Sequence, residues 1–287
     1  MNNNKQYPKR KAILIGCPGS GEGFLNGVKR DLKNVSKYLQ SEKGGVWYQN
    51  EIKTLSNPSY IQVRRELEKS NADYTFVYFS GHGYTDSDSN DRMLCLRDSD
   101  ISDDLLLNNS PRQLVLIDAC RNEISFGLSE APDFEPQWEH FTGSPVRELF
   151  DSYILNSPVG KLIVHGTQRG QVSYDSPTGG MFTNALLNIS TRIQTEQEYT
   201  QASIRNLINH VPLVLLPLGY NQIPTIVYKT GSLAVPFAIG IPNLGFPRSM
   251  RIPKRKSALI ANTTSNTNNE WFAIGVGLLI LAFAASD

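Results

Sequence analysis

Residues 74–83 read YTFVYFSGHG, and residues 113–121 read QLVLIDACR. Before its polar end, each run is almost wholly aliphatic, β-branched or aromatic, which is too continuous for a strand with one solvent-exposed face. Such runs are typical of strands that are buried on both faces of a parallel sheet. Neighbouring parallel strands end at the same edge of the sheet, where open α/β folds place their functional sites. We therefore expect His82 and Cys120 to reach one crevice.

A cysteine and a histidine that share a crevice suit nucleophilic catalysis at a carbonyl group. The cysteine attacks as its thiolate, while the imidazole helps to keep the thiol ionised and then protonates the leaving amine. Gly81 and Gly83 flank His82 and allow close backbone approach. This thiol chemistry requires no cofactor. The alternative is that the histidine and the cysteine serve packing alone.

Strands and helices alternate along most of the chain, which indicates an α/β fold. Further apolar runs predict strands at residues 11–16, 51–55 and 161–166, and the last strand of the fold at residues 223–227. Apolar residues at helical spacing predict helices over residues 25–39, 60–67, 182–193 and 203–211. Residues 121–160 contain four prolines and show no sustained period, so we expect an irregular segment there.

The motifs Ser80-Gly81-His82-Gly83 and Asp118-Ala119-Cys120 resemble those of the caspase and metacaspase cysteine peptidases, and the Asp-x-Cys form is closer to the metacaspases. The resemblance covers roughly residues 11–240, in the same order along the chain. It implies the caspase-hemoglobinase fold, in which a mostly parallel six-stranded sheet carries helices on both faces. An apolar C-terminal tail follows that fold in this sequence.

The resemblance also implies a cysteine endopeptidase that hydrolyses peptide bonds with a dyad of Cys120 and His82. The backbone N–H groups of Cys120 and Gly83 would hold the oxyanion, and regulated proteolysis in cell death or defence would be the setting. The chain departs from the family at Arg121-Asn122, where a glycine-containing turn is usual. A catalytically silent caspase-like adaptor tethered to a membrane is therefore the alternative function.

Substrate preference follows from acidic residues near the expected nucleophile. Asp118 lies two residues before Cys120, so both side chains point to the same side of the strand. The resemblance implies that Asp31, Ser80 and Asp118 line the S1 pocket, as the matching positions do in metacaspases. Two carboxylates in that pocket favour Arg or Lys at P1 and oppose Asp. The alternative for Asp118 is a helix or loop cap.

An acidic stretch after the histidine motif raises the question of a metal site. Residues 101–105 resemble the acidic stretch through which some metacaspases bind calcium, and the candidate ligands are Asp98, Asp103 and Asp104. Carboxylate oxygens suit Ca²⁺, which takes about six to eight oxygen ligands. The alternative is an ordinary acidic surface loop, because the spacing does not match an EF-hand.

A glycine-rich loop, CPGSGEG, follows the first predicted strand at residues 17–23. A phosphate-binding loop requires a lysine directly after its second glycine, but this sequence has Glu22 there. A carboxylate would repel phosphate, so the sequence argues against a nucleotide site.

The composition is that of a globular protein, with 287 residues, 40% hydrophobic and 19% charged. The formal net charge of +1 gives no indication of nucleic-acid binding. The family resemblance implies protein or peptide substrates. The first residues, MNNNKQY, lack the apolar core of a secretory signal, and the three cysteines do not suggest a disulfide framework. We therefore expect the peptidase domain in the cytoplasm.

The chain divides into a peptidase domain (1–240), a basic, polar linker (241–270) and a short apolar segment (271–285). As a helix, this last segment would span ~22 Å, less than the ~30 Å of a bilayer core. The basic linker and Trp271 favour attachment to the inner face of a membrane, with docking on the protein as the alternative. Lys254-Arg255-Lys256 also makes the linker a predicted substrate of the enzyme itself.

Overall fold

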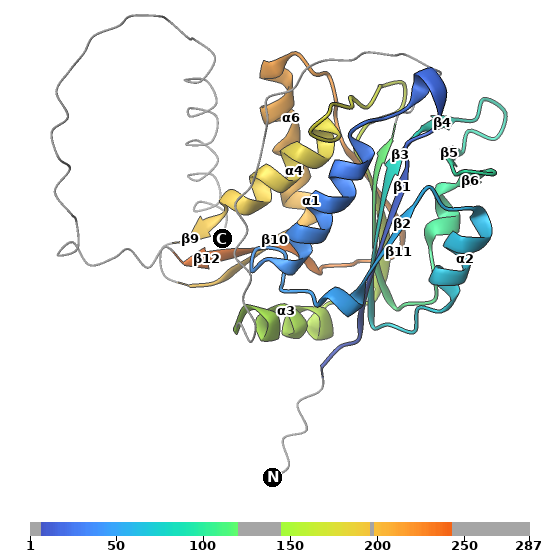
Figure 1. The fold of residues 1–287 in the computed structure, drawn as a ribbon. Coiled ribbons are helices and arrows are strands. Elements are labelled where there is room, and N and C mark those ends of the chain that lie inside the picture. Colours follow the sequence, from blue (N-terminus) through green and yellow to red (C-terminus); the bar gives the residue numbers. More distant parts are fainter. Residues whose placement is uncertain (1–6, 120–144, 196–197, 243–287) are drawn as a thin grey trace, which may run out of the picture.

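The computed structural model describes residues 7–119, 145–195 and 198–242 (Figure 1). Cys120, nearly all of the predicted linker and the apolar segment 271–285 lie outside these residues. The described chain contains a six-stranded sheet with the order β2-β1-β3-β7-β8-β11. All neighbours in this sheet are parallel except β11, which is antiparallel to β8. The prediction of a mostly parallel six-stranded sheet is confirmed.

The strands of the main sheet lie close to the predicted ranges. They are β1 (Arg10–Cys17), β2 (Ile52–Ser56), β3 (Tyr74–Gly81), β7 (Arg112–Ala119), β8 (Gly160–His165) and β11 (Thr225–Gly231). All eight residues of β3 are buried, and seven of the eight in β7 are buried. The two runs that define the fold are therefore central strands covered on both faces.

Helices cover both faces of the sheet. The α-helices of the described residues are α1 (Val28–Gln40), α2 (Tyr60–Glu68), α3 (Pro145–Asn156), α4 (Met181–Arg192), α5 (Ile204–Ile208) and α6 (Val211–Leu215). The 3₁₀ helices are η1 (Gly21–Gly23), η2 (Gln49–Glu51), η3 (Asp103–Leu106) and η4 (Leu216–Leu218). In Figure 1, α1, α3 and α4 lie on one side of the sheet, and α2 lies on the other.

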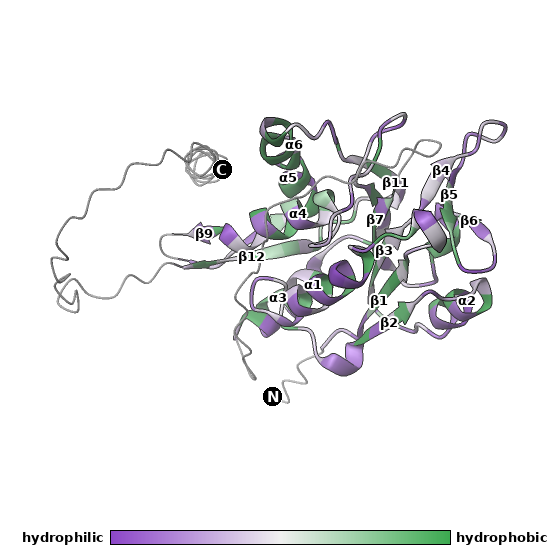
Figure 2. Cartoon of the chain, turned by 45° about the horizontal axis from the view of Figure 1, so that its top comes forward, coloured by the Kyte–Doolittle hydropathy of each residue, from purple (hydrophilic) through white to green (hydrophobic). Residues whose placement is uncertain are grey.

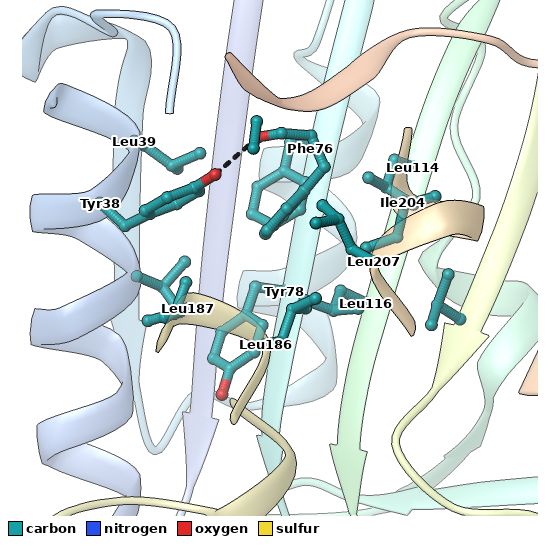
Figure 3. Packing of buried hydrophobic residues seen from close by; sticks show 14 of the residues in the cluster. Tyr38, Leu39, Phe76, Tyr78, Leu114, Leu116, Leu186, Leu187, Ile204 and Leu207 are labelled. Carbon is teal, nitrogen blue, oxygen red and sulfur yellow. Dashed lines mark hydrogen bonds between the residues drawn. The ribbon is translucent and has the colours of Figure 1, made fainter. Parts of the chain in front are cut away.

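Alternate side chains of one strand enter different cores. Phe76 and Tyr78 of β3 pack with α1, α4 and α5 in the larger core (Figure 3). Val77 and Phe79 of the same strand pack with α2 in the smaller core. Because successive side chains of a strand point to opposite faces, one continuous apolar run supplies both cores.

Two predictions about regular structure were wrong. Part of residues 121–160 forms α3, whose buried Val146, Phe150 and Ile154 have helical spacing. Pro145 is the first residue of this helix, a position where the missing N–H costs no hydrogen bond. The strand predicted at residues 223–227 is also followed by another, β12 (Pro236–Pro242).

Two small sheets complete the described fold. β4 (Gly83–Thr85), β5 (Arg92–Cys95) and β6 (Asp100–Ser102) form one, and β9 (Gln194–Thr195), β10 (Thr200–Ser203) and β12 form the other. Within the described ranges, none of the helices has the length and hydropathy that crossing a bilayer requires.

Candidate active site

The register of the sheet places the two motifs at neighbouring strand ends. Ser80 of β3 is opposite Asp118 of β7, and Gly81 is opposite Ala119. The next residues in the sequence are His82 and Cys120. Cys120 itself lies outside the described residues, so the structure gives the positions of His82 and of the residues predicted for the S1 pocket, but not that of the thiol.

His82 is held by a main-chain carbonyl. Its Nε2 lies 2.6 Å from the carbonyl oxygen of Gly23, which can only accept a hydrogen bond. The contact therefore requires a proton on Nε2 and, in the neutral ring, leaves the lone pair on Nδ1. A histidine in this tautomer has Nδ1 ready to take a proton from a thiol.

The glycine-rich loop after β1 makes this contact sterically feasible. Gly19 has a φ of +76°, and a Cβ at this position would lie 2.8 Å from the imidazole Cδ2 and Nε2 of His82. The N–H of Leu25 donates to the carbonyl oxygen of Pro18 at 2.8 Å and closes the loop. The loop therefore packs against the histidine, a role that the sequence analysis missed when it rejected phosphate binding.

Asp31 is a buried carboxylate on the first turn of α1. Its Oδ2 accepts a hydrogen bond from Ser80 Oγ at 2.8 Å, and its Oδ1 accepts one from the N–H of Gly180 at 2.9 Å. Only 1% of Asp31 is exposed. The structure therefore brings together Asp31 and Ser80, as the resemblance implies.

Asp118 lies beside them and is also buried. Its Oδ2 accepts hydrogen bonds from the N–H of Thr183 at 3.1 Å and from Thr183 Oγ1 at 2.7 Å. Its Oδ1 accepts one from Ser173 Oγ. Thr183 lies in the first turn of α4, so Asp118 has the capping role that was its alternative, and its place in the S1 pocket stays a prediction.

The beginning of α4 compensates both buried charges. Gly180, the N-cap residue of α4, donates its N–H to Asp31, and Thr183 donates to Asp118. The positive end of the helix dipole adds to these donors. A Cβ on Gly180 would lie 2.2 Å from Asp118 Oδ2, so the carboxylate fits only because this residue is glycine.

Burial raises the pKa of each carboxyl group in the pair. The pKa of Asp31 lies well above its ordinary value because the group is buried and because Asp118 is close. Burial also raises the pKa of Asp118, although the hydrogen bonds from Ser173 and Thr183 oppose this shift. The pair therefore favours a bound proton or cation, since either would relieve the repulsion between two carboxylates.

A third carboxylate, Asp175, was missed by the sequence analysis. Its Oδ2 accepts a hydrogen bond from the N–H of Gly27 at 3.1 Å, at the start of α1. Burial raises its pKa, with a further contribution from Asp118, while the nearby His82 acts in the opposite direction. Asp175 therefore interacts electrostatically with both Asp118 and His82, but it follows no strand motif that would have indicated a role.

The two described cysteines are poor candidates for the nucleophile. Burial raises the pKa of Cys17 to about 12, and burial also raises the pKa of Cys95 to about 12. A thiol in such an environment stays protonated near neutral pH and is inert.

The three candidate calcium ligands have other contacts. Asp98 accepts a hydrogen bond from the N–H of Tyr60 at 2.9 Å, Asp103 lies 3.1 Å from His165 Nε2, and Asp104 lies 2.6 Å from Lys229 Nζ. In the part of the chain that the structure describes, no group of three or more His, Cys, Asp or Glu side chains is arranged to hold a metal ion. Calcium binding stays a prediction.

Comparison with known proteins agrees with this geometry. The family model described as the caspase domain matches residues 9–232. The chain belongs to the caspase-domain family. It therefore has the fold of a caspase-like cysteine peptidase, and the metacaspase-like form of its motif is not distinguished by this match.

Solved structures show the same fold in two distant proteins. Caspase-1 from Spodoptera frugiperda has a TM-score of 0.51 and 19% identity, over 82% of this chain and 93% of that one. Protein GSU0716 from Geobacter sulfurreducens has a TM-score of 0.53 and 18% identity, over 81% of this chain and 100% of that one. No curated protein sequence matches the chain. At these identities the likeness establishes the fold alone.

Proposed function

We propose that the protein is a cysteine endopeptidase that cleaves peptide bonds after Arg or Lys. The observation that carries this proposal is the pair of buried carboxylates, Asp31 and Asp118, at the strand edge that also carries His82. A caspase-domain peptidase acts on protein substrates, and this pair supplies a negative pocket next to its histidine.

In this mechanism the thiolate of Cys120 attacks the scissile carbonyl carbon. His82 takes the thiol proton on Nδ1 and later gives it to the leaving amine, while Gly23 keeps Nε2 protonated. The N–H groups of Gly83 and Cys120 stabilise the tetrahedral oxyanion, and each such donor contributes roughly 3–4 kcal/mol. Gly83 begins β4 and pairs with Leu94, which fixes its backbone beside the histidine.

The same pocket explains the preference for a basic residue at P1. A guanidinium group can donate two parallel hydrogen bonds to a carboxylate, and both charges become compensated in a buried site. A P1 aspartate would add a third negative charge to the same pocket. Specificity of the kind that requires P1 aspartate is therefore opposed by like-charge repulsion.

Covalent labelling tests the nucleophile and the specificity together. Peptidyl acyloxymethyl ketones that end in arginine or in aspartate are incubated with the purified chain, and the labelled residue is located by mass spectrometry. We expect labelling at Cys120 by the arginine reagent, none in Cys120→Ala or His82→Ala, and normal labelling in Cys17→Ala and Cys95→Ala. Absence of labelling by both reagents would favour the silent adaptor, and labelling by the aspartate reagent would overturn the pocket assignment.

Membrane attachment, calcium dependence and biological role are inferred from the sequence alone. Residues 271–285 would hold the enzyme at the inner face of a membrane, and calcium would act on the acidic stretch if it is required. Profiles of cleavage sites with and without calcium test the second point. Regulated cell-death or defence proteolysis is the role that we infer from the family.

A further inference from the structure

Gln222 is a buried amide side chain beside the candidate pocket that no sequence motif indicates. It lies between η4 and β11 and is 0% exposed. Its Nε2 donates a hydrogen bond to Ser173 Oγ at 3.0 Å, and Ser173 Oγ donates one to Asp118 Oδ1. A single hydroxyl group therefore connects Gln222 to a carboxylate that is predicted for the S1 pocket.

The direction of these hydrogen bonds follows from the chemistry of the three groups. An ionised Asp118 can only accept, so the one proton of the Ser173 hydroxyl points to Oδ1. Ser173 Oγ then acts as the acceptor towards Gln222, whose only side-chain donor is the Nε2 group. Asp118 therefore fixes the orientation of the Gln222 amide through Ser173.

This orientation leaves the other end of the amide without a partner. Gln222 Oε1 is buried and accepts no hydrogen bond within the part of the chain that the structure describes. A buried acceptor without a donor lowers the stability of a fold, and its presence in a native structure requires an explanation. A side chain that served packing alone would be better replaced by methionine, which has a similar size. The contact that Nε2 makes with Ser173 supplies the explanation.

A second chain of hydrogen bonds ends on the other oxygen of Asp118. Tyr78 Oη lies 2.6 Å from Thr183 Oγ1, and Thr183 donates from both Oγ1 and its N–H to Asp118 Oδ2. Since the hydroxyl proton of Thr183 is used on Asp118, Tyr78 is the donor to Thr183. The described residues thus fill three of the roughly four acceptor positions of this carboxylate. The remaining position is on Oδ1, the oxygen that Ser173 holds.

From these observations we propose that Gln222 is a positioning residue that makes the pocket selective for arginine over lysine at P1. This inference rests on the proposed function. Gln222 holds Ser173, and Ser173 holds Oδ1 of Asp118, so the remaining acceptor position has a fixed direction. A planar guanidinium group requires acceptors in fixed positions, whereas a lysine ammonium group on its flexible stem tolerates their displacement. Loss of the Gln222 amide should therefore weaken the binding of arginine more than that of lysine.

Two loops that lie far apart in the sequence carry these contacts. Residues 171–174 lie beside residues 220–223, and the rings of Tyr174 and Tyr220 have centroids 5.0 Å apart. Figures 1 and 2 both show α6, which precedes the second loop, at the same end of the molecule as β4, which follows His82. The pocket is therefore supported by a part of the chain that carries none of the predicted site residues.

Peptide binding to the Cys120→Ala protein tests the proposal without catalysis. Acetylated tetrapeptide amides that differ only in a C-terminal arginine or lysine are titrated into the full-length chain, and calorimetry gives the ratio of the two Kd values. Gln222→Met keeps the size of the side chain and removes its amide. The matched control is Gln171→Met, because Gln171 joins the same two loops through Asn221 and Ile223.

We expect the Cys120→Ala protein to bind the arginine peptide more tightly than the lysine peptide. This preference should fall ~10-fold when Gln222→Met is added and stay within about twofold with Gln171→Met. The Tm should not fall in Gln222→Met, because the unpartnered Oε1 is removed as well. An unchanged preference in Gln222→Met would overturn this inference alone, whereas absence of arginine binding without it would overturn the proposed specificity too.

A double variant tests whether Gln222 acts through Ser173. Ser173→Ala removes the hydroxyl group between Gln222 and Asp118 and should lower the arginine preference by a similar factor. Adding Gln222→Met should then cause no further loss, because the contact that it would disrupt is already absent. In the active enzyme, Gln222→Met should raise KM for arginine substrates rather than lower kcat, since the P1 contact is present before and during the reaction. Additive losses, or a lower kcat at constant KM, would contradict the assignment.

Discussion

Asp31 illustrates how a carboxylate of the candidate pocket can lower the stability of the fold. Burial and the nearby Asp118 raise its pKa well above the ordinary value. The stabilisation from a carboxyl group whose pKa is raised by folding is fully present below the pKa of that group in the unfolded chain. It is lost as the pH rises through the higher pKa of the folded state, so the free energy of unfolding that Asp31 contributes falls as the pH rises from acid towards neutral.

Asp31→Asn should therefore raise the free energy of unfolding near neutral pH and leave it almost unchanged near pH 3, where Asp31 is protonated. The amide keeps an acceptor for Gly180 and can donate to Ser80, so packing is preserved. Urea denaturation at the two pH values measures this difference, with the exposed Asp88→Asn as the control.

The Asp31→Asn variant should also lower kcat/KM for arginine substrates ~10- to 100-fold, through loss of a charge-assisted contact. A variant that is destabilised at neutral pH, or that keeps full kcat/KM, would contradict the assignment.

The loop that holds His82 supplies a test with an internal control. Gly19→Ala places a Cβ against the imidazole, whereas Gly21→Ala meets nothing within 4 Å. Both glycines have a positive φ, +76° and +63°, so the two variants share the backbone strain. We expect kcat to fall ~10²-fold in Gly19→Ala only, because a displaced base transfers the proton poorly. Thermal unfolding should show similar decreases in Tm for the two variants. Equal kcat values would exclude a role for the contact between Gly19 and His82 in catalysis.

At the scale of elements, α3 is attached to the sheet through a buried charge. Arg10 of β1 is 5% exposed, and its Nε lies 3.2 Å from Asp151 of α3. The guanidinium also donates to the carbonyl oxygens of Gly45 and Val46 and lies over the rings of Trp47 and Phe150. Burial lowers the pKa of Arg10 to about 10, and Asp151 opposes that shift.

Asp151→Ala should destabilise the protein by about 3 kcal/mol, because it removes a charge partner from a buried cation. The control is Glu68→Ala, whose partner Arg64 lies 2.6 Å away on an exposed helix surface. That exposed pair should contribute little to stability, because water screens its charges. Urea denaturation of both variants compares them directly, and a similar small effect in each would show that Arg10 is stabilised without Asp151.

Strand positions could be predicted from the sequence because a buried parallel strand is a continuous apolar run. The partners of Asp31 and Asp118 could not be predicted, since Gly180, Thr183 and Ser173 lie between 55 and 149 residues away along the chain. These contacts depend on the path of the loop between β8 and α4, which has no periodic pattern. The Gly23 carbonyl was missed for a related reason, because any residue can supply a main-chain acceptor.

The distribution of charge over the whole molecule predicts that the protein cleaves itself. The candidate pocket collects carboxylates, whereas residues 199–269 contain none and include Lys254-Arg255-Lys256. An endopeptidase that prefers basic P1 residues requires an extended segment with such residues, and polar linkers supply one. Residues 243–287 lie outside the described chain, so this step rests on the sequence.

We expect the active full-length protein to cut itself after residue 254, 255 or 256, as measured by N-terminal sequencing of the small fragment. Cys120→Ala and the triple variant Lys254→Gln/Arg255→Gln/Lys256→Gln should both remain intact, the first because it lacks the nucleophile and the second because it lacks the P1 residue. The cut would separate the domain from residues 271–285. Cleaved protein should therefore shift from the membrane fraction to the soluble fraction, whereas the Cys120→Ala form should stay with the membranes. Intact active protein would contradict self-cleavage, and a Cys120→Ala form that is already soluble would contradict attachment through residues 271–285.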